Sequence, residues 1–419
     1  MTNSPKRVVI VGGGVIGVCC AYYLSRRGAD VTVVERDDIG SGASYGNAGT
    51  VAPGHGPINK PGRVLQGLKW MFDSTAPLHV APRFDPALVR WLWRFRVHCT
   101  EEHVRRSMDV MGPLGHASRA LFDELLDEES VDCGFRPEGY YEVYRTEKAF
   151  VEGRREAARI RSYDYRPEVL DGPAMMAREP ALKAGTVGGI FFPESATLDP
   201  LRFVLEMADR ARRHGTHIRT GSAVARVLVR EGEAVGVRLT DGEEIAADAV
   251  ILATGSYSPK LAARLGIHVP IQPGKGYHRD RTPDNGGAPA LGIACVLAER
   301  SVFCTPMDGF VRFAGTMEFS GLNHEIRRPR LEQLTESAKT YMEGVGDTAS
   351  SSEWCGLRPC TPDGLPVIGP APGYAGLFLA NGHAMLGLTL GPVTGRLIAE
   401  WVVDGRPSMD MGMLEVGRF

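Results

Sequence analysis

Residues 7–35 read RVVIVGGGVIGVCCAYYLSRRGADVTVVE. The apolar run at 8–11 predicts a short buried strand, and residues 15–27 predict a helix that stops at Gly28. A second apolar run at 31–34 predicts another strand, and Glu35 follows it directly. Two strands joined by one helix form a βαβ unit, so this stretch predicts a parallel sheet and an α/β fold.

Glycines separate the first strand from the helix in the pattern GxGxxG. In such a unit Gly12 allows the tight turn, Gly14 lets the backbone approach a pyrophosphate, and Gly17 lets the helix pack closely on the strand. The helix N-terminus offers free N–H groups to phosphates, and Glu35 stands where a carboxylate binds a ribose diol. The stretch predicts dinucleotide binding, with a glycine-rich turn in an ordinary α/β protein as the alternative.

Composition places the chain among ordinary globular proteins. Its 419 residues are enough for two domains, and 43% of them are hydrophobic and 23% charged. A formal net charge of −2 gives no basis for nucleic-acid binding. The eight cysteines form no CxxC pair and no zinc spacing, and His214 and His217 lack a third ligand, so we expect no metal site. Reduced thiols and the absence of a signal peptide favour a cytoplasmic protein.

Tryptophans and basic residues near position 90 leave two interpretations open. Trp70, Trp91 and Trp93 occur beside basic residues (Lys69, Arg90, Arg94 and Arg96). One interpretation is peripheral contact with the inner face of the cell membrane. The other is an amphipathic helix of the second domain. The uncharged run from 8 to 24 is better explained by the glycine-rich fingerprint than by a membrane span.

A second motif near the C-terminus identifies the family. Residues 356–369 read GLRPCTPDGLPVIG and residues 377–389 read LFLANGHAMLGLT. Together with residues 42–49, 275–278 and 314–319, they resemble the D-amino-acid oxidase/dehydrogenase superfamily of FAD-dependent oxidoreductases. The closest resemblance is to its bacterial D-amino-acid dehydrogenase branch, which includes D-hydroxyproline dehydrogenase. The resemblance spans nearly the whole chain and implies FAD as the bound dinucleotide.

The expected architecture follows from the strands and the resemblance together. We expect a Rossmann-like FAD-binding domain built from residues 1–85, 192–268 and 352–419. An inserted α+β substrate domain with an antiparallel sheet would comprise residues 86–191 and 269–351. A helix starting near residue 388 would direct its N-terminus to the pyrimidine edge of the flavin, where reduction places negative charge. The alternative is a plain strand-to-helix corner.

The two motifs and the resemblance give a set of expected cofactor-binding residues. They are Gly12, Gly13, Gly14, Val15, Ile16, Gly17, Glu35, Arg36, Ser44, Asn47, Ala48, Gly49, Val224, Thr254, Gly255, Gly356, Arg358, Gly382, His383, Met385, Leu386, Gly387, Leu388 and Thr389.

Candidate catalytic residues follow from what oxidation of an amino acid requires. The substrate must be held with its Cα–H facing flavin N5, so that a hydride can pass, and a fixed cation must bind its carboxylate. We expect Arg358 to be that cation, because the resemblance places the carboxylate clamp of the superfamily at Gly-Leu-Arg-Pro and a guanidinium suits bidentate carboxylate binding; the alternative is a surface or structural arginine. The resemblance places Tyr277 and His278 on a strand that covers the flavin. There we expect Tyr277 to hydrogen-bond the substrate carboxylate or close the pocket and His278 to tune the ionisation of the amine, with cross-strand packing as the alternative for both. Weaker candidates for substrate binding are His55, Glu318 and His383.

The sequence therefore predicts an FAD-dependent dehydrogenase or oxidase of D-amino acids, including cyclic ones such as D-proline and cis-4-hydroxy-D-proline. A quinone, another carrier or O₂ would accept the electrons, and the chain could form a homo-oligomer. Two alternatives stay open. One is an oxidase of glycine-like or N-substituted amines such as sarcosine, iminodiacetate or glyphosate. The other is a flavin-binding subunit of a larger dehydrogenase complex, against which a retained carboxylate clamp argues.

Overall fold

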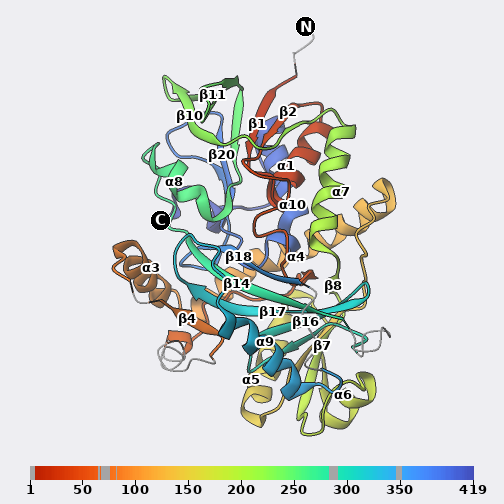
Figure 1. The fold of residues 1–419 in the computed structure, drawn as a ribbon. Helices are drawn as coiled ribbons and strands as arrows, with labels where there is room; N and C mark the ends of the chain where they lie inside the picture. The colour runs from red at the N-terminus through yellow and green to blue at the C-terminus, as the bar shows by residue number, and fades with distance from the viewer. Residues whose placement is uncertain (1–4, 65–66, 68–75, 82, 283–290, 346–351) are drawn as a thin grey trace.

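A parallel sheet assembled from distant segments carries the glycine-rich turn (Figure 1). The computed structural model describes residues 5–64, 67, 76–81, 83–282, 291–345 and 352–419. The strand order is β19-β20-β13-β1-β2-β9, and β19 alone among these strands runs antiparallel to its neighbour. The bounds are β1 (Arg7–Val11), β2 (Asp30–Val34), β9 (His217–Arg219), β13 (Ala249–Leu252), β19 (Val367–Pro370) and β20 (Leu377–Asn381).

Alternating side chains give this sheet two buried faces. Val8, Ile10 and their neighbours in register pack against helices α1 (Val15–Arg26), α4 (Glu101–Glu129), α7 (Pro200–Arg213) and α10 (Gly387–Asp404). Val9 and Val11 face the opposite way, toward a small antiparallel sheet of β10 (Val224–Arg230), β11 (Glu233–Leu239) and β12 (Glu244–Ala246). Strands buried on both faces read as continuous apolar runs, which is the pattern seen at residues 8–11 and 249–252.

A second, mostly antiparallel sheet lies between the nucleotide-binding part and helix α9 (Arg328–Tyr341) (Figure 1). Its order is β18-β14-β17-β16-β15-β5-β7-β6, with β4 added beside β17. The bounds are β4 (Leu78–Val80), β5 (Tyr140–Tyr144), β6 (Glu168–Asp171), β7 (Gly188–Phe192), β14 (Gln272–Arg281), β15 (Cys295–Leu297), β16 (Val302–Met307), β17 (Phe310–Phe319) and β18 (Ser352–Cys360). Helix α9 covers one face, and the other face looks toward the glycine-rich turn. The α/β fold with an antiparallel second sheet is confirmed.

Further elements complete the fold around the two sheets. They are β3 (Thr50–Val51), β8 (Ala196–Thr197), α3 (Pro86–Val97), α5 (Glu147–Ile160), α6 (Gly172–Arg178) and α8 (Ser258–Ala263), with 3₁₀ turns at Arg161–Tyr163, Gly255–Tyr257, Gly412–Leu414 and Val416–Arg418. Residues 86–129 form two helices, α3 and α4, because the side chain of Thr100 accepts from the N–H of His103 and starts α4. Lys69 and Trp70, part of the basic aromatic stretch noted above, lie outside the described residues.

The pairing of strands differs in places from the expected segment boundaries. Strand β4 lies within 1–85 and β18 within 352–419, yet both pair with strands of the second sheet. Conversely, α4 lies within 86–191 but packs on α10 of the nucleotide-binding part. These contacts join residues from about seventy to more than two hundred positions apart, so local sequence patterns do not reveal them. The division into two domains stays a prediction.

Candidate active site

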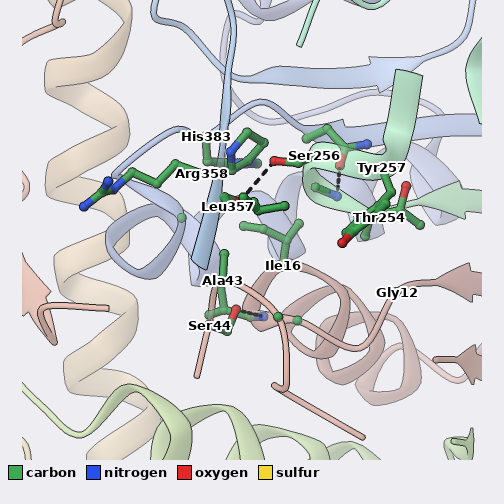
Figure 2. Close-up of a pocket in the computed structure, with 18 of the residues that line it drawn as sticks. Gly12, Ile16, Ala43, Ser44, Thr254, Ser256, Tyr257, Leu357, Arg358 and His383 are labelled. Carbon is green, nitrogen blue, oxygen red and sulfur yellow. Dashed lines mark hydrogen bonds between the residues drawn. The ribbon is translucent and has the colours of Figure 1, made fainter. Parts of the chain in front are cut away.

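One elongated cavity of about 800 Å³ lies between the two sheets. Its walls come from the glycine-rich turn, the loop at 40–55, the turn after β13, the end of β18 and the first turn of α10 (Figure 2). At one end are Glu35, Val224 and Thr240, and at the other are Arg358, His383 and Thr389. The carboxyl ends of parallel strands and two helix N-termini meet here, which is where open α/β sheets bind nucleotides.

The three fingerprint glycines have the geometry that a bound dinucleotide requires. Gly12 has φ +113°, and a Cβ there would lie 2.6 Å from the carbonyl oxygen of Ala253. A Cβ on Gly17 would overlap the carbonyl of Gly12, so the third glycine lets α1 pack against β1. Gly14 faces the cavity, with only the Ser44 hydroxyl 3.3 Å from a Cβ position. The turn therefore leaves space for a pyrophosphate where a side chain would otherwise stand.

Hydrogen bonds fix the groups that would hold the dinucleotide. The Val15 N–H donates to Ser44 Oγ (3.0 Å), which places that hydroxyl at the N-terminus of α1 (Figure 2). The carboxylate of Glu35 accepts from the N–H groups of Gly13 (2.7 Å) and Asp37 (2.9 Å). A carboxylate held in this way keeps lone pairs for a ribose diol. The donor set and the open turn fit FAD.

The C-terminal motif folds back onto the same cavity. The N–H of Ala384 donates to the carbonyl of Pro359 (3.0 Å), which ties the turn before α10 to the end of β18. His383 Nε2 lies 2.9 Å from Thr394 Oγ1, and burial lowers the pKa of His383 to about 3. A histidine with that pKa is neutral at pH 7, so it orients the turn and carries no positive charge there.

Arg358 extends along the cavity wall, away from the turn at 254–257 (Figure 2). Its Nη1 donates to the carbonyl of Thr316 (2.8 Å), and burial lowers the pKa of the guanidinium. Thr316 sits in a β-bulge of β17 with φ +59°, and the bulge directs its carbonyl at the arginine. A Cβ on Gly276 would overlap the guanidinium, so that glycine makes its position possible. Within the described residues, Arg358 forms no ion pair with a carboxylate.

The structure brings most of the expected cofactor residues to the cavity. Residues 12, 14–16, 35, 36, 44, 47, 48, 224, 254, 255, 358, 383 and 385–389 line it. Gly13, Gly17, Gly49, Gly356 and Gly382 do not line it; each lies where a Cβ would crowd a neighbouring group. These glycines shape the backbone around the cavity, and their part in binding the cofactor stays a prediction.

Two expected site residues lie on the wrong face of the second sheet. The hydroxyl of Tyr277 donates to Glu318 (2.9 Å), Lys275 pairs with the same carboxylate (3.1 Å), and none of the three lines the cavity. Burial favours a protonated Glu318, but hydrogen bonds from Ser320, Tyr277 and Lys275 outweigh it and lower the pKa of Glu318. Side chains alternate along a strand, so Tyr277 faces α9. The roles expected for Tyr277 and Glu318 at the substrate are therefore corrected.

His278 faces the nucleotide-binding side but does not line the cavity. Its Nδ1 lies 2.6 Å from the carbonyl of Gly46, and its ring stacks on Trp354. Burial, followed by the charge of Arg312, lowers its pKa. The expected role of His278 in tuning the substrate amine is replaced by contact with the loop at 46–48.

His55 does line the cavity near α10. Its Nδ1 lies 2.7 Å from the carbonyl of Gly56, and the N–H of Ala52, three residues earlier, donates to Thr389 (3.0 Å). Burial, and then the charge of Lys60, lower the pKa of His55. The ring is neutral at pH 7, with its proton on Nδ1 because a carbonyl can only accept.

Sequence reasoning missed some residues that complete the cavity. Asn381 accepts from the N–H of Gly255 (2.8 Å) and donates to the carbonyl of Leu252 (2.6 Å), which joins the ends of β13 and β20. The hydroxyl of Ser256 donates to the carbonyl of Leu357 (3.0 Å). Phe303 and Ala314 add an apolar wall from the second sheet. An asparagine at the end of an apolar strand was the one available signal.

Comparison with known proteins agrees with this geometry. The family model described as FAD dependent oxidoreductase (DAO) matches residues 7–401. A protein named D-amino acid dehydrogenase from Methylobacterium nodulans is 36% identical over 410 residues, covering 96% of both chains. One of the same name from Xanthobacter autotrophicus is 35% identical and covers 99% of both.

Solved structures share the fold at lower identity. Glycine oxidase from Geobacillus kaustophilus superimposes with a TM-score of 0.78 at 23% identity, covering 99% of both chains. Iminodiacetate oxidase from Chelativorans sp. BNC1 superimposes with a TM-score of 0.76 at 21% identity, covering 98% of both. The chain belongs to the DAO family of FAD-dependent oxidoreductases, and its cofactor is FAD. Among the described residues, no helix is both long enough and apolar enough to cross a bilayer.

Proposed function

We propose that this protein is an FAD-dependent dehydrogenase of D-amino acids, and that cyclic substrates such as D-proline and cis-4-hydroxy-D-proline are among those it oxidises. The observation that carries the proposal is Arg358, a half-buried guanidinium on the cavity wall that no carboxylate of the described chain neutralises. An unpaired buried cation is costly, so its presence favours an anionic partner that arrives with the substrate. Relatives at 35–36% identity named D-amino acid dehydrogenase support the substrate class.

The residues of the cavity would divide the work as follows. Arg358 binds the substrate carboxylate and fixes its orientation. Phe303 and Ala314 exclude water from the side-chain end, and the N-terminus of α10 places a positive dipole end at the opposite wall. FAD, when bound, supplies the acceptor for the hydrogen and electron pair of the Cα–H bond. The substrate also loses a proton from nitrogen and becomes an imine.

His55 is the group we propose to receive a hydrogen bond from the substrate nitrogen. With its proton on Nδ1, donated to Gly56, its Nε2 is the acceptor. A neutral imidazole suits this position, because a charged one would repel an ammonium. Arg358 would thus orient the substrate carboxylate, and His55 Nε2 would hold the substrate nitrogen.

Anaerobic bleaching of the flavin absorbance tests the proposal. The panel contains matched D- and L-amino acids, D-proline, cis-4-hydroxy-D-proline, sarcosine and glycine, and Arg358→Met serves as the control. Bleaching by D-compounds that slows strongly in the variant supports the proposal. Bleaching by sarcosine or glycine alone would move the function to amine oxidation, and a bound flavin that no compound reduces would favour an electron-transferring subunit.

We also propose that the outer face of α3 contacts an anionic membrane surface. Val89, Trp93 and Val97 form one exposed stripe at helical spacing, with Trp93 63% exposed. Three arginines of α3 flank the stripe, namely Arg90, Arg94 and Arg96. The helix carries no acidic side chain. Exposed aromatic and basic residues on one helix suit the headgroup region of a bilayer.

Vesicle sedimentation tests the contact. The holoenzyme should pellet with vesicles of mixed neutral and anionic phospholipid, and Trp93→Ser should reduce the pelleted fraction severalfold. Leu205→Ser, which removes an exposed apolar side chain from α7, is the matched control. Equal pelleting of Trp93→Ser and the wild type, or none by the wild type, would contradict the proposal.

A further inference from the structure

Three consecutive carbonyls of one cavity loop are held by three strands of the second sheet. The carbonyl of Gly46 accepts from His278 Nδ1 (2.6 Å), and that of Asn47 accepts from Arg312 Nη1 (3.2 Å). The carbonyl of Ala48 accepts from Thr305 Oγ1 (2.8 Å). The donors come from β14, β17 and β16, which are adjacent in that order (Figure 1). The loop therefore crosses the sheet and contacts one strand per residue.

Strand register explains how the sheet can do this. Asp280, Arg312 and Thr305 are direct cross-strand partners, so they form one row on the face that meets the loop. Arg312 and Thr305 project from adjacent strands about 4.8 Å apart, and their side chains reach the carbonyls of two consecutive loop residues. The adjacent row is His278, Ala314 and Phe303, of which the last two line the cavity.

The donors are themselves fixed. Arg312 is buried and makes two hydrogen bonds to Asp280, Nε to Oδ1 at 2.8 Å and Nη2 to Oδ2 at 2.9 Å. Thr305 and His278 have no exposed surface. The loop fits closely because position 46 is glycine: a Cβ there would lie 2.6 Å from His278 Nδ1 and 2.8 Å from Trp354. A buried donor whose own position is fixed by hydrogen bonds, as Arg312 is by Asp280, holds a loop more rigidly than an exposed donor does.

The opposite side of the loop is left for the cofactor. Asn47 and Ala48 line the cavity, and within the described chain their backbone N–H groups donate to no protein acceptor. Both residues are partly buried, and with no protein acceptor their N–H groups are available to an acceptor bound in the cavity. The peptide units that carry these N–H groups have the carbonyls of Gly46 and Asn47, which His278 and Arg312 hold, and so their orientation is fixed. Thr305 holds the next peptide unit through the Ala48 carbonyl and limits the backbone rotation of Ala48.

We propose that the row Asp280–Arg312–Thr305, together with His278, is a positioning device that aims the N–H groups of Asn47 and Ala48 at the flavin. The residues act through the loop and are positioning residues, with no direct contact to substrate required. The inference rests on FAD binding, which the family establishes, and not on the identity of the substrate. The second sheet would thus set both the affinity for FAD and the environment of the flavin ring.

Paired substitutions separate positioning from general stability. Thr305→Val removes the hydroxyl at constant shape, and Thr305→Ser restores it. His278→Ala removes the Nδ1 donor, and His278→Asn places an amide nitrogen near the same position. The matched controls are Arg279→Lys and Thr335→Val, since Arg279 is the neighbour of His278 on β14 but bonds Thr335 and Glu353 on the α9 side.

The measurements are the dissociation constant of FAD from the refolded apoprotein, the visible absorbance and circular dichroism of the bound flavin, and the thermal unfolding temperature. We expect Thr305→Val and His278→Ala to weaken FAD binding about tenfold and to change the visible spectrum. The Ser and Asn variants should recover most of both, and the controls should stay within twofold of the wild type.

Folded Thr305→Val and His278→Ala proteins with wild-type affinity and spectra would overturn the proposal. Equal loss of affinity in the two controls would do the same, because the effect would then be one of general stability. Neither readout needs a substrate. Failure of the proposed D-amino-acid activity would leave these results interpretable, and failure here would leave that activity untouched.

Discussion

Replacement of Arg358 by methionine is the sharpest test of the carboxylate site, because stability and activity should respond differently. The side chain is half-buried, burial lowers its pKa, and its one hydrogen bond within the described chain goes to Thr316. Methionine keeps much of the apolar volume and removes the charge. The flavin-free protein loses one hydrogen bond, worth about 1 kcal/mol, and is relieved of an unpaired buried charge. We therefore expect its free energy of unfolding to fall by no more than about 1 kcal/mol.

Catalysis should suffer far more. A bidentate guanidinium–carboxylate contact contains two charge-assisted hydrogen bonds, each worth about 1.5–3 kcal/mol. Loss of about 4 kcal/mol corresponds to a decrease of roughly a thousandfold in kcat/KM. Arg358→Lys keeps the positive charge but loses the bidentate geometry, so its kcat/KM should lie between those of the wild type and Arg358→Met.

The assay combines steady-state kcat/KM for the best D-amino acid of the panel with anaerobic stopped-flow reduction and urea unfolding of the apoprotein. The absorbance of bound FAD in each variant confirms that the cofactor remains. A kcat/KM for Arg358→Met within tenfold of the wild type would refute the assignment of Arg358 to the carboxylate. A loss of several kcal/mol in stability would show that the arginine is structural.

Three further predictions concern the walls of the cavity. Gly276→Ala places a methyl where the Arg358 guanidinium lies, so KM for the amino acid should rise at least tenfold while FAD stays bound; an unchanged KM would contradict this. Gly14→Val fills the space left for the pyrophosphate, and the purified variant should contain no stoichiometric FAD by absorbance. Burial lowers the pKa of His383 to about 3, against about 6.5 in the unfolded chain, so the native state binds fewer protons. The free energy of unfolding of the apoprotein should therefore fall by about 2 kcal/mol for this histidine between pH 7 and pH 5. His383→Gln should show a smaller fall by urea titration, and an equal fall in both proteins would contradict the prediction.

Local patterns in the sequence predicted the nucleotide-binding half well, for a physical reason. Residues 7–35 form a βαβ unit whose strands, helix and glycines are all set by near neighbours, and the structure places Gly12, Gly14 and Glu35 as expected. The C-terminal motif likewise put Arg358 on the cavity wall. The position of a side chain can be predicted from local sequence when it depends only on the backbone of one supersecondary unit, such as this βαβ unit.

The second sheet shows where such reasoning stops. From the sequence, Tyr277 and His278 were equal candidates, but adjacent side chains on a strand face opposite ways and only packing decides which face meets the cavity. Helix α9 covers the Tyr277 face, so Tyr277 bonds Glu318 there while His278 faces the loop at Gly46. The bulge at Thr316 and the space at Gly276 depend in the same way on a strand some forty residues distant.

By itself, then, the sequence determined the βαβ unit, the FAD family and the presence of Arg358 at the cavity, where we propose that it binds a carboxylate. Only the tertiary structure decided which face of the second sheet meets the cofactor cavity, and it joined Thr305, Arg312 and His278 to the three carbonyls of residues 46–48. The first set depends on interactions between near neighbours in the chain. The second depends on strand order and register within the second sheet, and on hydrogen bonds from that sheet to a loop more than two hundred residues away in the chain.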